Sequence, residues 1–328
     1  MTQLKIGTHD ESFHCDEVLA CVMLKMIPKY KNAKIIRTRD KSLLEECDIV
    51  VDVGGVFDHK KNRYDHHQHG FDKTMNSISK GKLIFQTKLS SAGLVYWFYG
   101  EQIICRFLKI HTKYVDKAKL EYIFEAVYKF FIKEIDYLDN YGGGKNSSTS
   151  SLTSRVGRLR PQWDDDKQNF DECFEEAYSL VKSEFVDCLK EIESKWRARN
   201  IWKEKLKERK SFHWSGRVLV LDKWIPGRDD LGRIQKELEI RDEETILYIV
   251  TPDPVHDRYS VKCTNTKNDN GNNETLFPEK WRGKNGDELE NITKIPGTEY
   301  VHNGGWSAAG DTTETIFKMI DFVLQNQN

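Results

Sequence analysis

The sequence predicts an α/β protein with a parallel-sheet domain first, then a helical connector, then a smaller mixed α/β domain. Three observations support this fold class. Short apolar runs alternate with helical patterns before residue 55, helical patterns fill much of the chain between residues 90 and 210, and β-type apolar runs return after residue 216. Alternating strands and helices are typical of βαβ units, in which the strands run parallel.

The N-terminal elements follow from the apolar pattern. LKIGTH is a predicted strand that ends in polar residues, and DEVLACVMLKMI has the spacing of an amphipathic helix that Pro28 closes. AKIIRT is a second predicted strand, and Asp40 is placed to cap a short helix in DKSLLEEC. DIVVDVGG is an apolar run with one aspartate and two glycines, which is typical of a buried parallel strand.

The rest of the chain divides where these patterns change. SSAGLVYWFYGEQIICRFL and KLEYIFEAVYKFFIKEIDYLDNY are predicted helices, and residues 170–210 form a long, charge-rich amphipathic pattern. GRVLVLDKW, ETILYIVTP and RYSVKCTN are predicted strands, and TETIFKMIDFVL is a predicted closing helix. We therefore expect domains at residues 1–165 and 211–328, joined by a helical connector at 166–210.

Composition predicts an intracellular protein, in the cytoplasm, the nucleus or both. No apolar run approaches the ~20 residues of a membrane helix, and the N-terminus has neither an apolar signal segment nor an Arg-rich presequence. The seven cysteines are scattered without a CxxC pair, which favours a reducing compartment. The net charge of -1 excludes a globally basic nucleic-acid binder, so a polyanion site needs local clustering. The oligomeric state stays open.

Half of the 10 histidines fall into two short runs. GTHDESFHCDE holds His9 and His14 with two aspartates and two glutamates, and RYDHHQHG holds His66, His67 and His69. The first run follows the first predicted strand, and ligands bind beyond the carboxyl ends of parallel strands. Imidazoles and carboxylates without paired thiolates suit Mn²⁺, Fe²⁺, Co²⁺ or Zn²⁺. The two runs therefore predict a divalent-metal site at this edge of the sheet.

An acidic residue inside an apolar strand strengthens this prediction. Asp52 is costly to bury unless it pairs or binds metal, and at a strand end it could bridge two ions. Asp136 and Asp139 lie three residues apart on a predicted helix end, so both could face one side. A single histidine pair or DHH triplet often arises by chance. The metal site is predicted because the three motifs occur together, in this order, in one α/β unit.

Candidate phosphate-binding groups lie on the same unit. Arg37 and Arg39 follow the second predicted strand and are expected to point toward the same edge, although a solvated pair is an alternative. Ser90 and Ser91 begin a predicted helix, whose N-terminus could hold a phosphate. A plain N-cap is the alternative for the serines.

Further candidates lie later in the chain. SRVGRLR contains three arginines that could track a phosphate backbone, Arg155, Arg158 and Arg160. A base could be stacked or hydrogen-bonded by Trp281, Arg282 and His302. Trp281 could equally be a core residue.

Together these motifs resemble the melanocyte-proliferating-gene (Myg) family of the DHH phosphoesterase superfamily, which includes RecJ-type exonucleases and family II pyrophosphatases. The similarity is carried by GTHDESFHCDEVLAC, RTRD, CDIVVDVGG, RYDHHQ, QTKLSSAGL and KWRG. It runs through almost the whole chain and is densest before residue 100. It implies a DHH-type catalytic domain at 1–165 and a substrate-binding domain at 211–328.

The resemblance also implies residue roles. The metal ligands it implies are His9, His14, Asp16, Asp52, His66 and Asp136, with Asp139 as the competitor for the last position. Two divalent ions, Mn²⁺ first and Zn²⁺, Co²⁺, Fe²⁺ or Mg²⁺ as alternatives, would activate a shared water. In this scheme His67 acts on the phosphate or leaving oxygen, and Asp65 orients an imidazole.

The predicted function is a metal-dependent phosphodiesterase, and the resemblance implies a 3′-to-5′ exonuclease that acts on single-stranded RNA. A small-molecule phosphohydrolase that acts on pyrophosphate or short nucleotides needs the same two ions and is the alternative. A non-catalytic binding protein with a decayed site is a further hypothesis. Two departures from the family pattern bear on this. His9-Asp10-Glu11 replaces His-Asn-Gly, and Ala308 and Ala309 replace glycines in the C-terminal glycine-rich loop.

Overall fold

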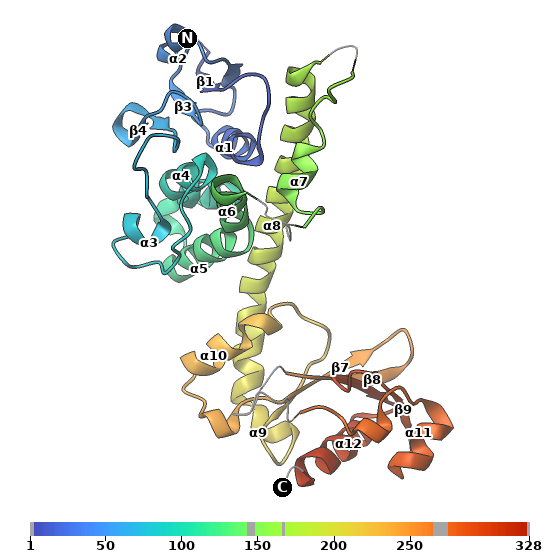
Figure 1. Ribbon diagram of the computed structural model, residues 1–328. Coiled ribbons are helices and arrows are strands. Elements are labelled where there is room, and N and C mark those ends of the chain that lie inside the picture. The colour runs from blue at the N-terminus through green and yellow to red at the C-terminus, as the bar shows by residue number, and fades with distance from the viewer. Residues whose placement is uncertain (1–2, 143–147, 166–167, 265–274, 327–328) are drawn as a thin grey trace. The chain divides into compact units, whose positions relative to one another are not determined.

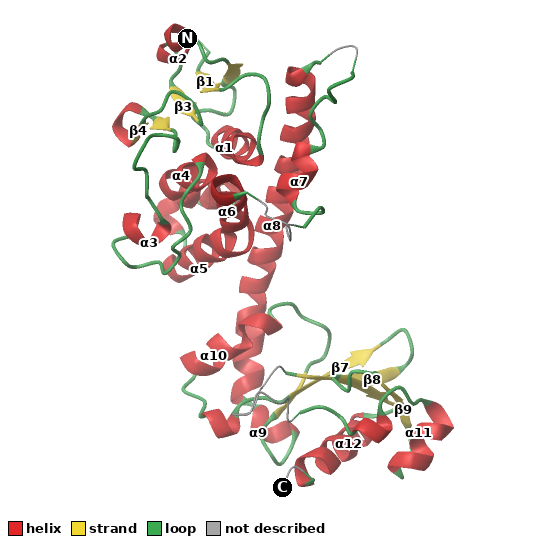
Figure 2. Ribbon diagram, viewed as in Figure 1, coloured by secondary structure: helices red, strands yellow, loops and turns green. Residues whose placement is uncertain are grey.

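The computed structural model describes residues 3–142, 148–165, 168–264 and 275–326. The chain forms two compact units, residues 1–193 and 194–328 (Figure 1). Each unit has one five-stranded sheet with helices around it, which confirms the α/β class (Figure 2). No helix among the described residues is long and apolar enough to cross a membrane.

The first sheet has the strand order β2-β1-β3-β5-β4. Its strands are β1 (Lys5–Thr8), β2 (Lys34–Arg37), β3 (Ile49–Val51), β4 (Phe57–Asp58) and β5 (Arg63–Tyr64). β1 pairs in parallel with β2 and β3, and β3 with β5, as the apolar pattern predicted for the first three strands. The sheet is mixed rather than purely parallel, because β4 pairs antiparallel to β5 at one edge.

Helices make up the rest of the first unit. They are α1 (Cys15–Met26), α2 (Lys41–Glu45), α3 (Met75–Ile78), α4 (Ser91–Phe107), α5 (Lys117–Val127), α6 (Lys133–Tyr141) and α7 (Leu152–Gly157), with 3₁₀ turns at His59–Lys61 and Thr112–Tyr114. Asp40 caps α2 as predicted, since its carboxylate accepts the N–H groups of Ser42 and Leu43. A π-helical segment, Tyr128–Ile132, joins α5 to α6, a helix type that often occurs near functional sites.

Helix α8 (Phe170–Lys207) contributes to both units. In the first unit, Phe174 packs edge-to-face on Phe13, and Phe185 packs on Phe131. Its C-terminal part supplies Ala198, Trp202 and Leu206 to a buried cluster of the second unit. Residues 170–207 of the predicted pattern therefore form one helix whose two ends lie in different cores.

The second unit has the strand order β6-β7-β8-β10-β9, and only the β6–β7 pair is parallel. The strands are β6 (Val218–Val220), β7 (Tyr248–Asp253), β8 (Arg258–Cys263), β9 (Thr298–Val301) and β10 (Ser307–Gly310). The helices are α9 (Arg209–Phe212), α10 (Leu231–Glu237), α11 (Gly286–Thr293) and α12 (Thr313–Gln325), with 3₁₀ turns at Arg228–Asp230, Asp242–Glu244 and Glu279–Trp281.

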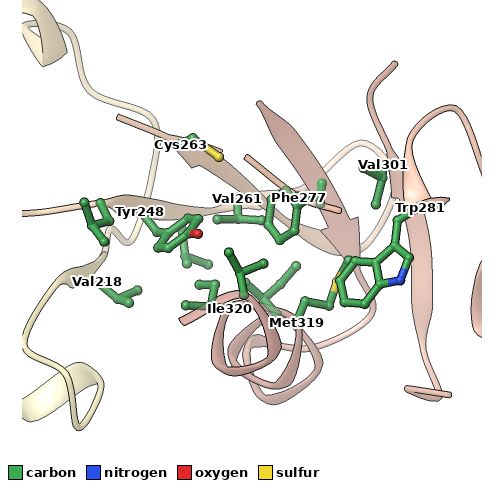
Figure 3. Packing of buried hydrophobic residues seen from close by; sticks show 14 of the residues in the cluster. Val218, Tyr248, Val261, Cys263, Phe277, Trp281, Val301, Met319 and Ile320 are labelled. Carbon is green, nitrogen blue, oxygen red and sulfur yellow. The ribbon is translucent and has the colours of Figure 1, made fainter. Parts of the chain in front are cut away.

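Aromatic and aliphatic side chains fill the space between this sheet and α12. Phe277 and Trp281 pack with Met319 and Ile320 in the buried cluster (Figure 3). Trp281 is fully buried, so it is a core residue and has no face free to stack on a base. Ala308 and Ala309 are buried in β10 rather than placed in a loop, because that strand lies between β8 and β9.

Candidate metal centre

Polar residues gather at the carboxyl ends of three neighbouring strands. His9 follows β1, Asp52 follows β3, and Asp65 and His66 follow β5. All four residues are buried, with exposed fractions of 2–3%. This is the edge at which ligands bind to parallel sheets, and it is where the sequence predicted the site.

Asp52 lies at the centre of the cluster. Its backbone has φ 59°, in the left-handed region that non-glycine residues rarely adopt. Its Oδ2 lies 3.3 Å from Nε2 of His9, and its Oδ1 lies 3.2 Å from Nε2 of His66. The Ser91 hydroxyl donates to the same Oδ1 at 2.9 Å. Such backbone conformations concentrate at functional sites, and this one aims a single carboxylate at two imidazoles.

A first ligand group forms around His9. Potential ligand atoms of His9, His14, Glu17 and Asp52 lie within 4.8 Å of one another. His9 Nδ1 is 3.1 Å from the carbonyl of Asp10, so Nε2 is the ring nitrogen that faces the carboxylates. Glu17 Oε1 lies 3.2 Å from this Nε2 and accepts the His14 N–H at 2.7 Å, while its buried Oε2 has no hydrogen-bond partner.

A second ligand group surrounds His66. Its Nε2 lies 3.2 Å from Asp52 Oδ1, 3.1 Å from Asp139 Oδ2 and 3.8 Å from Asp16 Oδ2. Neither this Nε2 nor Asp16 Oδ1 has a hydrogen-bond partner, although both are buried. His14, Asp16 and Asp139 have ligand atoms within 4.8 Å of one another, and so do Asp52, His66 and His67. Asp52 therefore belongs to both groups.

The electrostatics favour positive charge between the two groups. Burial opposes ionisation of Asp52, but the nearby imidazoles of His66 and His9 outweigh it and hold the pKa of Asp52 below its usual range. Burial would lower the pKa of His9, yet hydrogen bonds with Asp52 and Glu17 raise it to about 10. The carboxylates thus stabilise positive charge at the His9 ring, which a proton or a metal ion can supply.

The three acids of the second group surround the single imidazole of His66. Burial, reinforced by the nearby charge of Asp52, raises the pKa values of Asp16 and Asp139. Crowded, buried carboxylates with unpartnered oxygens cost free energy unless a cation binds. The donor set consists of carboxylate oxygens and imidazole nitrogens, and some of these buried atoms have no hydrogen-bond partner. It therefore fits divalent metal ions.

His67 is held differently from His66. Its Nδ1 lies 2.8 Å from Asp65 Oδ1, and Asp65 also accepts the N–H groups of His67 at 3.0 Å and Gly55 at 2.6 Å. The hydrogen bond to Asp65 raises the pKa of His67. The His67 side chain is 62% exposed. Asp65 therefore orients the His67 imidazole with Nε2 away from the carboxylate, an arrangement suited to proton donation.

Comparison with known proteins places the chain in a family. The family described as "Uncharacterised protein family (UPF0160)", whose model carries the name MYG1 exonuclease, matches residues 5–324. The chain belongs to the MYG1 family. It is 37% identical to MYG1 protein C27H6.8 of Caenorhabditis elegans, with 99% of this chain and 96% of that protein covered. It is 36% identical to MYG1 exonuclease of Bos taurus, with 97% of this chain and 84% of that protein covered. It is 34% identical to MYG1 exonuclease of Homo sapiens, with 100% of this chain and 88% of that protein covered.

The structure places Asp139, not Asp136, in this MYG1 site. Asp136 Oδ1 accepts from Ser90 N at 2.9 Å, Ser90 Oγ at 2.7 Å and Gly93 N at 3.1 Å, and Oδ2 accepts from Tyr128 OH at 3.0 Å. A Cβ on Gly93 would lie 2.5 Å from Asp136 Oδ2, so the close approach requires glycine. The Asp136 carboxylate therefore faces the N-terminus of α4, while Asp139, the competitor for the last ligand position, lies 3.1 Å from His66 Nε2. Which of the two binds metal remains a prediction.

The two serines at the start of α4 also form hydrogen bonds with other residues of the protein. Both are fully buried. Ser90 binds Asp136, while Ser91 donates its hydroxyl to Asp52 and its backbone N–H to Asp16 at 3.3 Å. The donors of Ser90 and Ser91 therefore orient carboxylates in this structure. Contact of the two serines with a substrate phosphate remains a prediction.

Arg37 and Arg39 have different environments. Arg37 is largely buried over the Phe174 ring, and its guanidinium donates to Asp171 at 2.6 Å and to the Glu11 carbonyl at 2.5 Å. Arg39 is 59% exposed and lies 3.3 Å from Asp10. Arg39 remains accessible to a substrate, whereas Arg37 holds the loop that carries the first motif.

The same loop explains the first departure from the family pattern. Glu11 has φ 57°, the left-handed conformation that glycine adopts without strain. Glu11 therefore has the backbone conformation that suits the glycine expected at this position from the resemblance. Arg37 holds the carbonyl of Glu11, and Arg160 donates to the carbonyl of Phe13 at 2.6 Å, so two arginines fix the loop on either side of Ser12.

The remaining predicted substrate residues make local contacts within their own units. Arg155 pairs with Glu184 at 2.6 Å in the first unit. In the second unit, Arg282 donates to the Phe277 carbonyl at 2.9 Å. His302 Nδ1 accepts the Gly304 N–H at 3.0 Å, and its ring centroid lies 4.4 Å from that of the half-exposed Trp306. Their roles in substrate binding remain predictions.

Sequence reasoning missed two residues of the site. Glu17 lies in the first motif, and its position three residues after His14 is the spacing of a capping box, which could have indicated a buried role at the start of α1. Asn140 lies 3.3 Å from His66 Nδ1. No signal in the sequence distinguishes it from an ordinary helix residue.

Proposed function

We propose that this MYG1-family chain is a metal-dependent phosphodiesterase that removes nucleotides from the 3′ end of single-stranded RNA. The observation that carries the proposal is the pair of ligand groups that share Asp52. The bovine and human relatives are named exonucleases, which favours a nucleic-acid substrate. Membership of the DHH superfamily, the RNA preference and the 3′-to-5′ direction rest on the motif resemblance.

Each ligand group would hold one divalent ion. His9, His14 and Asp52 would bind the first, and Asp16, Asp52, His66 and Asp139 the second. Mn²⁺ suits this mixture of imidazole and carboxylate donors, with Zn²⁺, Co²⁺, Fe²⁺ and Mg²⁺ as alternatives. Bound there, such ions activate a water nucleophile and neutralise charge on phosphoryl oxygens.

The chain's own groups would orient the substrate and move protons. Ser91 and the left-handed backbone hold Asp52 between the two groups. Asp65 fixes His67 through Nδ1, so the exposed Nε2 of His67 would donate a proton to the leaving oxygen or bind the scissile phosphate. Arg39 would supply an accessible cation beside the first motif.

A labelled RNA oligomer tests the proposal. With Mn²⁺ and a single-stranded RNA labelled at its 5′ end, we expect a ladder of progressively shorter labelled products. Degradation from the 5′ end would instead release the label at once as a mononucleotide. A DNA oligomer of the same sequence tests sugar specificity, and EDTA and Asp52→Asn are the matched controls. Asparagine tolerates the left-handed backbone but removes the shared charge.

The alternatives give different outcomes. Phosphate release from pyrophosphate or a short nucleotide with the RNA left intact would favour a small-molecule phosphohydrolase, which the same two ligand groups could serve. A purified chain that binds no Mn²⁺, Zn²⁺ or Fe²⁺ and shows no metal-stimulated turnover would contradict the proposal and favour a binding protein.

A further inference from the structure

The side-chain amide of Asn140 is fixed by two main-chain carbonyl groups. Asn140 Nδ2 donates to the Lys88 carbonyl at 3.0 Å and to the Asp136 carbonyl at 2.8 Å. Turning the amide over would place Oδ1 against these two oxygens, which have no hydrogen to donate. The amide oxygen therefore points to His66 Nδ1, 3.3 Å away.

We infer that Asn140 is a positioning residue that sets the tautomer of His66, with the proton on Nδ1 and the lone pair on Nε2. An amide oxygen accepts and cannot donate, so the ring nitrogen opposite it must carry the hydrogen. In a neutral imidazole the other nitrogen then has none. That nitrogen is the Nε2 that faces the three acids of the second ligand group, Asp16, Asp52 and Asp139.

This tautomer is unfavourable without a cation and favourable with one. A lone pair directed at three carboxylates is repelled by them, and a metal ion between them converts that repulsion into coordination. Without the Asn140 acceptor, Nε2 could keep its proton and donate to Asp139 or Asp52. The His66 ring and the carboxylates would then be hydrogen-bonded to one another. A metal ion would have to displace the proton on Nε2 before it could bind. Partners of this kind typically change metal affinity ~10–100-fold.

His9 shows the same arrangement with a different acceptor. Its Nδ1 faces the main-chain carbonyl of Asp10 at 3.1 Å, and its Nε2 faces Glu17 and Asp52. Both metal-facing imidazoles are therefore oriented through Nδ1. Only the acceptor of His66 is a side chain, so only that one can be removed by substitution.

Side-chain ¹⁵N–¹H NMR of the metal-free chain tests the inference. Spectra are recorded in EDTA over a rising pH series until the His66 ring has lost one of its two protons, and His66→Gln identifies the His66 signal. We expect the Nδ1–H pattern in the unsubstituted chain and the Nε2–H pattern in Asn140→Leu. Asn76→Leu is the matched control, because Asn76 is a half-buried asparagine whose Nδ2 binds the Leu83 carbonyl away from His66. It should leave the His66 pattern unchanged.

Metal titration provides a second readout. Asn140→Leu should weaken Mn²⁺ binding at one site ~10–100-fold, and Asn76→Leu should leave it unchanged. Only this step of the inference rests on the proposed function. An Nε2–H pattern in the unsubstituted chain, or an Nδ1–H pattern retained in Asn140→Leu, would overturn the inference. A chain that shows the expected tautomers but degrades no RNA would overturn the proposed function and leave the role of Asn140 intact.

Discussion

At the scale of single residues, the two histidines of the DHH triplet have separable roles. His66 Nε2 faces three carboxylates, whereas His67 is bound to Asp65 and open to solvent. His66→Ala should reduce the bound metal at one site, because a ligand is lost. His67→Ala should keep the metal and lower turnover ~10²–10⁴-fold, because a proton donor is lost. Metal content per chain and turnover, measured on both variants, check this. Loss of metal in His67→Ala alone would reverse the assignment.

Asp136 predicts a pH-dependent stability that does not involve metal. Burial raises its pKa to about 7, although bonds from Ser90, Tyr128 and Gly93 oppose the rise. Because the folded pKa exceeds the unfolded value, the stability that Asp136 adds is complete at pH 4 and falls as the pH rises toward 7. Relative to Asp136→Asn, the unsubstituted chain should lose up to about 1.4 kcal/mol per pH unit in that window.

Urea denaturation in EDTA at several pH values measures this difference. Asp72→Asn is the control, because the Asp72 side chain is 82% exposed. It should show no such trend. A difference between the unsubstituted chain and Asp136→Asn that stays constant from pH 4 to pH 7 would mean that the four hydrogen bonds outweigh burial and keep the carboxylate ionised.

At the scale of elements, the loop between β1 and α1 has a strained backbone at Glu11, whose side chain is exposed. Left-handed backbone costs a non-glycine residue roughly 1–2 kcal/mol, and Glu11 has φ 57°. Glu11→Gly should therefore leave stability unchanged or raise it by up to about 1 kcal/mol, after glycine's own entropy cost. Glu101→Gly, at an exposed position of α4, should destabilise by about 1 kcal/mol. The urea midpoints of the two variants compare their stabilities, provided that the denaturant dependence (m value) is unchanged. An equal loss of stability in both variants would show that the backbone at Glu11 is unstrained.

The elements themselves were largely predictable, and the exceptions have physical reasons. Long apolar periods identified α1, α4, α8 and the strands β1 to β3, because burial of one face requires that pattern. The two-residue strands β4 and β5 are too short to show a period. In the second unit, β10 was missed because the run Ser307–Gly310 is built from small residues that favour no strand.

The candidate site was predictable in its motifs but not in its last ligand. The histidine runs and Asp52 fall at strand ends, where topology alone brings them together. Asp136 and Asp139 share a helix and a three-residue spacing, so the sequence could not separate them. Which of the two aspartates faces His66 depends on how α6 packs against the N-terminus of α4. Local sequence does not reveal this tertiary packing. The same contact buries Ser90 and Ser91 and pairs their hydroxyl groups with the carboxylates of Asp136 and Asp52.

At the scale of the whole molecule, the second unit depends on the end of α8. Trp202 is buried at 1% exposure, and its indole N–H donates to the Pro226 carbonyl at 2.8 Å. With Ala198 and Leu206 it packs against side chains of the second unit, among them Leu219, Leu221, Ile225, Leu231 and Ile234. A chain that begins at residue 211, where the sequence pattern placed the domain boundary, would leave these apolar side chains uncovered.

We therefore expect residues 194–328 to fold alone and residues 211–328 not to fold. Loss of a buried tryptophan costs about 3–5 kcal/mol, and domains have only about 5–15 kcal/mol of stability in total. Losing three core residues together should therefore abolish the cooperative transition. Circular dichroism during urea denaturation measures this, with Trp202→Ala in 194–328 as the intermediate case. If both fragments unfold cooperatively at the same urea midpoint, α8 is a dispensable connector, and the boundary belongs near residue 211 after all.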